Sequence, residues 1–507
     1  MPVQTAVASR PRLLSALAAG AMLPLAFAPF GWHVVAVLSL AALWWLWEGL
    51  APWSAARVGF AWGAGAFLTG TYWLYISIHV FGQAPLAVAI LLMLGLVAIM
   101  ALYPAFAGYL CARAGGTGLA RWLLLLPGTW VLAEWLRGWV ASGFPWLSLG
   151  YSQTDAWPGG YAPLAGVYGI GLAVAVLAGS FVALVRGRGH ERIVALAVGA
   201  AVLAGGYVSG SRDWTTPTGR TVAVALVQGA VPQERKWLPE QRQPTKDLYR
   251  SLSVASAGAD LIVWPEAAIP AVAHEELDYL AAVEADLRAR GADLMLGMLE
   301  EDPETGGYYN SLIALGDEPG VYRKRHLVPF GEYFPVPGFV RDWMRLMSLP
   351  YVDISRGPRR PAPLVVAGEP VALSICYEDA FGAEQRPFLP AATLMVNISN
   401  DAWFGDSIAP HQHLQISRLR AMEAGRYLLR ATNTGISAVI GPDGRLAATS
   451  PQFETDVLEA SVGPREGATP WVRWGNVPAV GLSAVFAVAG ALAARRRRPR
   501  DRGEPPA

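Results

Sequence analysis

The N-terminal part of the chain consists of long apolar stretches separated by short polar breaks that contain arginine. Each stretch approaches the roughly 20 residues that an α-helix needs to cross about 30 Å of hydrocarbon. The first two stretches are short, and the first contains Pro24 and Pro29, so their ends are the least well defined. We expect seven transmembrane helices here, at about residues 13–29, 33–50, 57–79, 85–112, 119–138, 162–185 and 192–210.

After Arg212 the pattern changes, and short β-branched apolar runs alternate with helical segments that carry charge. The predicted strands are Thr221–Gln228, Asp260–Trp264, Asp293–Met298, Ser311–Leu315, Val371–Ile375, Leu394–Ile398 and Ser437–Gly441, and the predicted helices are 238–256, 275–290 and 413–429. This alternation indicates an α/β domain whose sheet is buried on its faces. It ends near Pro470, and an eighth apolar span follows at Val477–Ala494.

The arginines orient the chain in the membrane. If the N-terminus lies in the cytoplasm, the inner loops hold most of the arginines near the spans, and the short outer loops hold little beyond Arg137. The positive-inside rule predicts this asymmetry. The three predicted parts are a membrane domain at residues 1–214, a catalytic domain outside the cytoplasm at 215–470, and an eighth span with a basic cytoplasmic tail at 471–507.

The composition agrees with a membrane protein. Of the 507 residues, 53% are hydrophobic and only 16% are charged, whereas a soluble domain has about 25% charged residues. High hydrophobicity excludes a disordered chain. A net charge of +1 argues against a nucleic-acid binder, and two cysteines cannot build a disulfide framework.

Three residues that follow or lie near strand-like runs of the α/β domain combine the groups needed for nucleophilic catalysis. Glu266 supplies a base, Lys324 a cation and Cys376 a nucleophile. A thiol needs its proton removed to attack a carbonyl, and an ammonium or a backbone N–H can stabilise the resulting oxyanion. Position in the sequence alone does not bring these residues together, because each also suits an ordinary surface or core position.

Histidines offer two other interpretations. A Cys–His dyad with His326, His411 or His413 is chemically as reasonable as the Glu–Lys–Cys set. The spacing His411-x-His413 suggests a metal site only weakly, since two further ligands are not apparent nearby.

Several motifs resemble those of the nitrilase, or carbon–nitrogen hydrolase, superfamily, and in particular the apolipoprotein N-acyltransferases of the bacterial inner membrane. Trp264-Pro265-Glu266, Lys324–Pro335 and Ile375-Cys376-Tyr377-Glu378 are similar to the glutamate, lysine and cysteine motifs of the family. In the membrane part, Ser142–Trp146 fits this family and not the soluble nitrilases. Further similar segments are Gly150–Gln153, Val396–Gly405 and Asn433–Ser437. The resemblance implies about eight transmembrane helices and a nitrilase-like α-β-β-α sandwich.

The resemblance also implies a function, the final step of lipoprotein maturation. Cys376 would attack an ester of a phospholipid to give a thioester, and phosphatidylethanolamine is the expected donor. The acyl chain would then pass to the α-amino group of an S-diacylglyceryl cysteine at the N-terminus of an apolipoprotein. Glu266 would accept the protons, and Lys324 would stabilise the oxyanions. No metal and no cofactor are implied.

Other residues are carried over as supporting or substrate-binding. The resemblance gives Glu332, Tyr377 and Glu378 supporting roles in the site. An apolar segment from Phe334 to Pro350 suits a lid that dips into the membrane surface. The residues expected to bind substrate are Trp237, Phe334 and Trp343.

Two other functions remain open from the sequence. A membrane-tethered amidohydrolase would share the Glu–Lys–Cys set and use water as the acceptor. A transporter with an appended sensor domain is a different class, but the spans lack a pair of charges at mid-membrane, and Glu134 is the only carboxylate well inside one.

Overall fold

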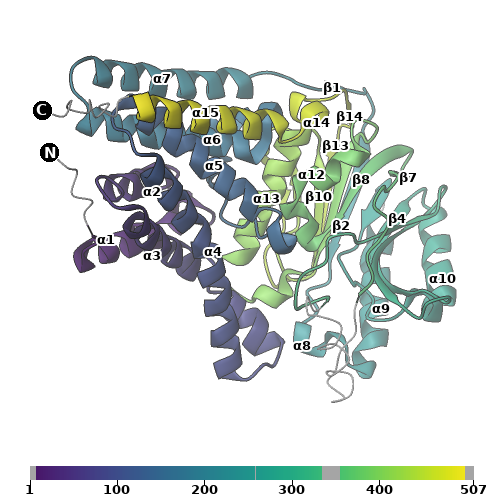
Figure 1. The fold of residues 1–507 in the computed structure, drawn as a ribbon. Coiled ribbons are helices and arrows are strands. Elements are labelled where there is room, and N and C mark those ends of the chain that lie inside the picture. The colour runs from purple at the N-terminus through teal and green to yellow at the C-terminus, as the bar shows by residue number, and fades with distance from the viewer. Residues whose placement is uncertain (1–6, 257, 334–353, 497–507) are drawn as a thin grey trace, which may run out of the picture. The chain divides into compact units, whose positions relative to one another are not determined.

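The computed structural model describes residues 7–256, 258–333 and 354–496. These residues form two compact units, one from the described residues up to Arg212 and from Trp474 onward, and the other from the described residues between Asp213 and Arg473 (Figure 1). We call them the helical unit and the sheet unit, and we describe each by itself.

In the helical unit, a helix overlaps each of the eight predicted spans, although the ends of several differ. They are α1 (Arg10–Ala21), α2 (Val34–Leu46), α3 (Pro52–Gly70), α4 (Leu86–Ala114), α5 (Leu126–Arg137), α6 (Ala162–Arg186), α7 (His190–Gly210) and α15 (Val477–Arg496). Four helical segments among the described residues are long and apolar enough to cross a membrane: Leu86–Ala114, Trp157–Arg186, His190–Gly210 and Val477–Arg496. Helices α1 and α5 have 12 residues each, which is about 18 Å at 1.5 Å per residue. The count of eight crossings therefore stays a prediction.

Small residues let the helices of this unit pack at backbone distance. A Cβ atom on Gly20 of α1 would lie 1.9 Å from the carbonyl oxygen of Trp62 in α3, and one on Gly65 of α3 would lie 2.1 Å from that of Leu17 in α1. Only glycine permits this approach at both positions. Such close contacts replace the hydrophobic drive that helices lack inside lipid.

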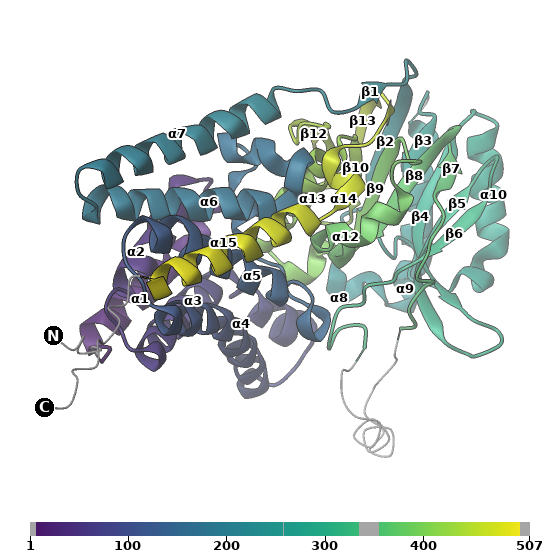
Figure 2. The same ribbon diagram turned by 45° about the horizontal axis from the view of Figure 1, so that its top comes forward.

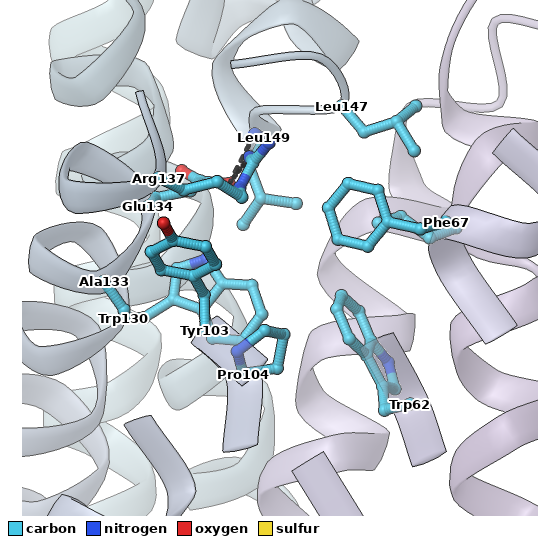
Figure 3. A pocket seen from close by; sticks show the side chains of 11 residues that line it. Trp62, Phe67, Tyr103, Pro104, Trp130, Ala133, Glu134, Arg137, Leu147 and Leu149 are labelled. Carbon is cyan, nitrogen blue, oxygen red and sulfur yellow. Dashed lines mark hydrogen bonds and ion pairs between the residues drawn. The ribbon is translucent and has the colours of Figure 1, made fainter. Parts of the chain in front are cut away.

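A buried ion pair fastens the loop that follows α5. Glu134 Oε1 accepts the N–H of Leu149 at 2.9 Å, and Arg137 donates to the carbonyl oxygens of Phe144 and Trp146 at 2.6 Å each. The two side chains lie on the wall of a small pocket that is otherwise lined mostly by aromatic and aliphatic groups (Figure 3). Glu134 and Arg137 therefore have a structural role, because together they hold this loop in place. Glu134 gives no support to a transporter function.

The sheet unit contains two six-stranded sheets and a two-stranded one (Figure 2). The first has the order β13-β2-β3-β4-β5-β6, with bounds Asp456–Val462, Val222–Gln228, Leu261–Val263, Asp293–Glu301, Tyr308–Leu315 and Gly320–Arg323. The second has the order β12-β11-β10-β9-β8-β7, with bounds Leu446–Thr449, Ala438–Ile440, Leu428–Thr432, Leu394–Ser399, Glu369–Ile375 and Leu364–Val366. Strands β1 (Thr216–Pro217) and β14 (Arg465–Glu466) form the third.

Alternation along the strands builds the layers. In β2, Val224 and Leu226 share a core with Leu373 of β8 and Val396 of β9, so the two large sheets pack face to face. The opposite face of β2 and β3 packs against α9 (Pro239–Ala255) and α10 (Leu277–Arg288). Helix α13 (Ala409–Ala424) contacts β10 of the second sheet. The unit is therefore the expected α-β-β-α sandwich.

The predicted helix at 413–429 is wrong at its C-terminal end. Helix α13 stops at Ala424, because Gly425 adopts a left-handed conformation with φ of 64°, and glycine is the residue that takes this conformation at least cost. Leu428 and Leu429 belong instead to β10, which pairs parallel with β9. The apolar pattern of a fully buried strand does not differ from that of a buried helix over so few residues.

Candidate active site

The strand directions bring the three predicted reactive residues to the same region of the sheet unit. Strands β2, β3 and β4 run parallel, as do β8, β9 and β10. Glu266 follows β3, and Cys376 follows β8 directly. Lys324 follows β6, which runs in the direction of β4 because β5 is antiparallel to both. Functional groups in such sheets gather at the carboxyl ends of the strands.

Glu266 is buried and held by three donors. Its Oε1 accepts from Asn310 Nδ2 at 2.7 Å and from Lys324 Nζ at 3.4 Å. Its Oε2 accepts the backbone N–H of Asn400 at 2.9 Å. The carboxylate is thereby fixed in orientation from three different elements of the sandwich.

Lys324 is 1% exposed and lies between two carboxylates. Its Nζ donates to Glu332 Oε1 at 2.9 Å and to Glu266 at 3.4 Å. Burial works against the charged form, but the carboxylates of Glu332 and Glu266 raise the pKa of Lys324 above its ordinary value. The side chain is therefore a positively charged hydrogen-bond donor at neutral pH and does not give up its proton as a general acid would.

Cys376 sits on a strained turn, with φ of 53°, in the left-handed region that a non-glycine residue seldom adopts. Burial and the charge of Glu266 raise the pKa of its thiol, and Lys324 acts in the opposite direction. The charges of both residues are thus close enough to act on the sulfur. Because the thiol holds its proton at neutral pH, an attack on a carbonyl would need a base in the same site.

Asn310 in β5 is a site residue that the sequence analysis missed. Its Nδ2 donates to Glu266 Oε1 at 2.7 Å and to Glu332 Oε1 at 3.0 Å, so one amide group links the two carboxylates. Its backbone carbonyl also accepts the N–H of Lys324 at 2.8 Å. An asparagine within a strand has no pattern that separates it from any other polar strand residue.

Glu378, one of the predicted supporting residues, clamps the turn that carries the nucleophile. Its carboxylate accepts the N–H of Ile375 at 2.8 Å and the hydroxyl of Tyr322 at 2.8 Å. It also accepts the N–H groups of Arg325 and His326, at 2.7 and 3.1 Å. One buried side chain therefore ties the end of β8 to the loop that follows Lys324.

The remaining predicted site residues are Tyr377, Trp237, Phe334 and Trp343, and the structure describes only the first two. The ring of Tyr377 packs edge-on against Phe381, with centroids 5.0 Å apart. Trp237 is 49% exposed and follows α8 (Gln233–Lys236). Phe334 and Trp343 lie outside the described residues, and so does the rest of the predicted lid up to residue 350; their roles stay predictions.

Two of the three candidate histidines, His413 and His326, contact acidic side chains. His413 Nε2 lies 3.2 Å from the backbone carbonyl oxygen of Cys376, and its Nδ1 lies 2.9 Å from Asp401 Oδ1. His326 Nδ1 lies 2.8 Å from Glu384 Oε1, and its ring stacks on Phe381. These contacts give His413 and His326 structural roles. For His411, burial lowers the pKa of the ring, partly offset by Asp406.

The backbone of Cys376 contacts a buried charged network formed by His413, Asp401 and Arg430. Asp401 Oδ2 accepts from Arg430 at 2.7 Å, and its other oxygen faces His413. Burial opposes the charge of Asp401, but Arg430 and His413 hold the pKa of this carboxyl well below its usual range.

In the part of the chain that the structure describes, no group of three or more His, Cys, Asp and Glu side chains is arranged to hold a metal ion.

Two protein-family models match the chain, one in the helical unit and one in the sheet unit. Residues 19–180 match the apolipoprotein N-acyltransferase N-terminal domain, and residues 223–469 match the carbon–nitrogen hydrolase family. The chain is also similar to the crystal structure of a carbon–nitrogen hydrolase from Helicobacter pylori G27, with 14% identity, a TM-score of 0.38, and coverage of 55% of this chain and 96% of that one.

Named relatives match almost the whole chain. The apolipoprotein N-acyltransferase of Methylococcus capsulatus is 44% identical over 490 residues, which cover 96% of each chain. That of Nitrosomonas europaea is 42% identical over 488 residues, which cover 95% of this chain and 97% of the relative. With this identity over nearly its full length, the chain belongs to the apolipoprotein N-acyltransferase family.

Proposed function

We propose that this protein transfers an acyl chain from a phospholipid to the α-amino group of the S-diacylglyceryl cysteine of apolipoproteins. Its membership of the apolipoprotein N-acyltransferase family supports the reaction. The observation that supports the mechanism is that the buried Lys324 Nζ contacts the carboxylates of Glu332 and Glu266, while the charges of Lys324 and Glu266 both act on the Cys376 thiol.

In the first half-reaction, the carboxylate of Glu266 accepts the proton of the Cys376 thiol as the sulfur attacks the ester carbonyl carbon of the phospholipid. The carbon–sulfur bond forms, and the carbonyl electron pair moves onto oxygen. The ammonium of Lys324 and the backbone N–H that follows Cys376 stabilise this oxyanion. When it collapses, the carbon–oxygen bond breaks, the alkoxide takes the proton from Glu266, and a lysophospholipid leaves.

In the second half-reaction, the α-amine of the apolipoprotein attacks the thioester. Glu266 accepts a proton from the attacking nitrogen, and Lys324 again stabilises the oxyanion. Collapse breaks the carbon–sulfur bond and returns the proton to Cys376. The site thereby begins and ends in the same protonation state, as a ping-pong reaction requires.

The helical unit has a physical purpose in this reaction. Both substrates carry acyl chains in the bilayer, and moving an acyl chain into water costs about 0.8 kcal/mol per CH₂ group. An enzyme held at the membrane surface needs to lift only the reacting ester. We propose the inner membrane as the location, with phosphatidylethanolamine as the donor.

The proposed topology has eight crossings, both termini in the cytoplasm, and the domain at 215–470 on the outer face. A membrane-impermeant maleimide tests it with single cysteines at two exposed positions, Asp443 and Arg188. Asp443→Cys should react on the outer face, and Arg188→Cys only after the membrane is permeabilised. The reverse labelling would reject this orientation.

The function itself is tested in proteoliposomes that contain phosphatidylethanolamine with one labelled acyl chain. A diacylated lipopeptide with a free α-amine should receive the label, and the same lipopeptide with an acetylated amine should not. One lysophospholipid should form for each acyl chain transferred. Release of labelled fatty acid at the same rate with either lipopeptide would instead identify a hydrolase.

A further inference from the structure

A second buried lysine lies beside the active site. Lys236 ends the short helix α8 and is 1% exposed. Its Nζ donates to the backbone carbonyl oxygen of Glu266 at 3.3 Å. The reaction described above assigns this lysine no role.

The peptide group that Lys236 holds lies at a strained turn. Ala267, the next residue, has φ of 47°, which is unfavourable for a residue with a side chain. Gly297 of β4 also packs so closely that a Cβ atom there would lie 2.6 Å from the Cα of Glu266. The backbone of Glu266 is therefore held by contacts with both Gly297 and Lys236.

Helix α8 is linked to Glu266 a second time. Gln233, at its first position, accepts from Asn400 Nδ2 at 2.9 Å, and the backbone N–H of Asn400 donates to Glu266 Oε2. Lys236 thus contacts the backbone of Glu266 while Gln233 supports a donor to its carboxylate. A displacement of α8 would change both contacts.

Stability of the fold does not explain a lysine at this position. Burial lowers the pKa of Lys236 to about 8, and the charge of Glu266 offsets only part of this effect. The unfolded chain therefore binds the proton more tightly than the folded one, so the charge costs folding free energy as the pH falls below about 10.5, and the full cost is present below about pH 8. An apolar side chain of similar length would avoid that cost.

We propose that Lys236 is a positioning residue for Glu266, which holds the peptide that follows the base and adds a second positive charge to the site. This inference rests on the proposed function. Among the residues that the structure describes, Lys324, Lys236 and the Cys376 thiol interact electrostatically with Glu266, and Glu332 shares Lys324 and Asn310 with it. Without Lys236, two carboxylates share a single ammonium, and the negative charge that develops on sulfur and oxygen meets a site that is already negative.

Three substitutions separate the charge from the hydrogen bond. Lys236→Arg keeps both, Lys236→Gln keeps a donor without the charge, and Lys236→Met removes both. Lys246→Met is the matched control, because Lys246 lies on the neighbouring helix α9 and pairs with Glu276 at 2.6 Å, away from Glu266. The full-length protein in phosphatidylethanolamine vesicles is assayed for lysophospholipid release before any lipopeptide is added.

The Gln and Met variants should form the acyl-enzyme about 10- to 100-fold more slowly, as misplacement of a catalytic group predicts, while KM for the phospholipid stays within about twofold. The wild-type rate should decline as the pH rises through about 8, where Lys236 loses its proton. The Arg variant should keep its rate to higher pH. Thermal midpoints of the Gln and Met variants should equal or exceed that of the wild type, which a merely structural lysine would not allow.

Wild-type rates in both the Gln and the Met variant would overturn the proposal, and so would an equal loss in Lys246→Met. If the Met variant does not accumulate, the Gln variant, which keeps a hydrogen-bond donor, decides. If the wild type itself forms no acyl-enzyme, the proposed function fails independently. The same variants are then compared by alkylation of Cys376 with iodoacetamide across pH, where loss of the Lys236 charge should slow the reaction and an unchanged profile would overturn the inference.

Discussion

The ammonium of Lys324 donates to the carboxylate of Glu332 at 2.9 Å, inside a site where the lysine is almost fully buried. Glu332 and Glu266 together keep Lys324 charged, and Glu332 is the nearer of the two carboxylates. In the proposed reaction, Glu266 is the carboxylate that exchanges a proton, while Glu332 remains the partner of Lys324.

Replacing Glu332 by Gln should lower kcat for lipopeptide acylation by about 100-fold, since a charge-assisted hydrogen bond to the oxyanion-stabilising group is lost. KM should change little. Glu300→Gln is the matched control, because Glu300 pairs with Arg323, one residue before Lys324, at 3.1 Å. Equal kcat values for the Glu332 variant and the wild type would remove Glu332 from the mechanism.

Asn310 gives a sharper test of the carboxylate pair. Asn310→Ala should reduce the rate by about tenfold, the usual effect of losing about 1–2 kcal/mol of hydrogen bonding. Asn310→Asp should be much worse, because it places a third carboxylate between Glu266 and Glu332. The ratio of the two rates is the measurement, and an Asp variant as active as the Ala variant would contradict the proposed charge balance.

Replacing Glu266 should have opposite effects on the reactivity of the Cys376 thiol and on acyl transfer. Burial and the charge of Glu266 raise its pKa, so iodoacetamide should alkylate it slowly at pH 7 and faster as the pH rises. Glu266→Gln removes the negative charge and should shift the alkylation profile to lower pH, yet it should abolish acyl transfer. Lys324→Ala should shift the profile to higher pH. Acyl transfer retained by the Glu266 variant would exclude this residue as the base.

Glu378 should matter for stability as well as activity. Its carboxylate accepts from four donors, and Glu378→Ala would leave them unpaired in the interior, at a cost of about 3 kcal/mol or more. The thermal midpoint measured by calorimetry should fall by several degrees. Tyr322→Phe, which removes only one of the donors, should have a much smaller effect. Equal midpoints for these two variants would show that the clamp does not hold the turn.

The sequence allowed the sandwich and the reactive set to be predicted to different depths. Glu266 and Cys376 follow apolar strand runs and lie in recognisable motifs, and the structure places both with Lys324. Asn310 could not be found, because its role depends on β5 pairing with β4 and β6 and not on any local pattern. The predicted helix at 413–429 runs into the first two residues of β10, Leu428 and Leu429, because a fully buried strand lacks alternation. Helix positions in the helical unit follow from hydropathy, but the number of crossings does not, because short helices such as α1 do not span a bilayer alone.

If Cys376 carries the acyl chain between the two lipid substrates, mass spectrometry of the full-length protein after incubation with phosphatidylethanolamine vesicles should detect the acyl-enzyme. We expect the intact protein to gain the mass of one acyl chain, and peptide mapping to locate it on the peptide that contains Cys376. The addition should be absent in Cys376→Ser and should disappear when a diacylated lipopeptide with a free amine is added. A wild-type protein that acylates the lipopeptide but never carries acyl mass on Cys376 would exclude the thioester intermediate.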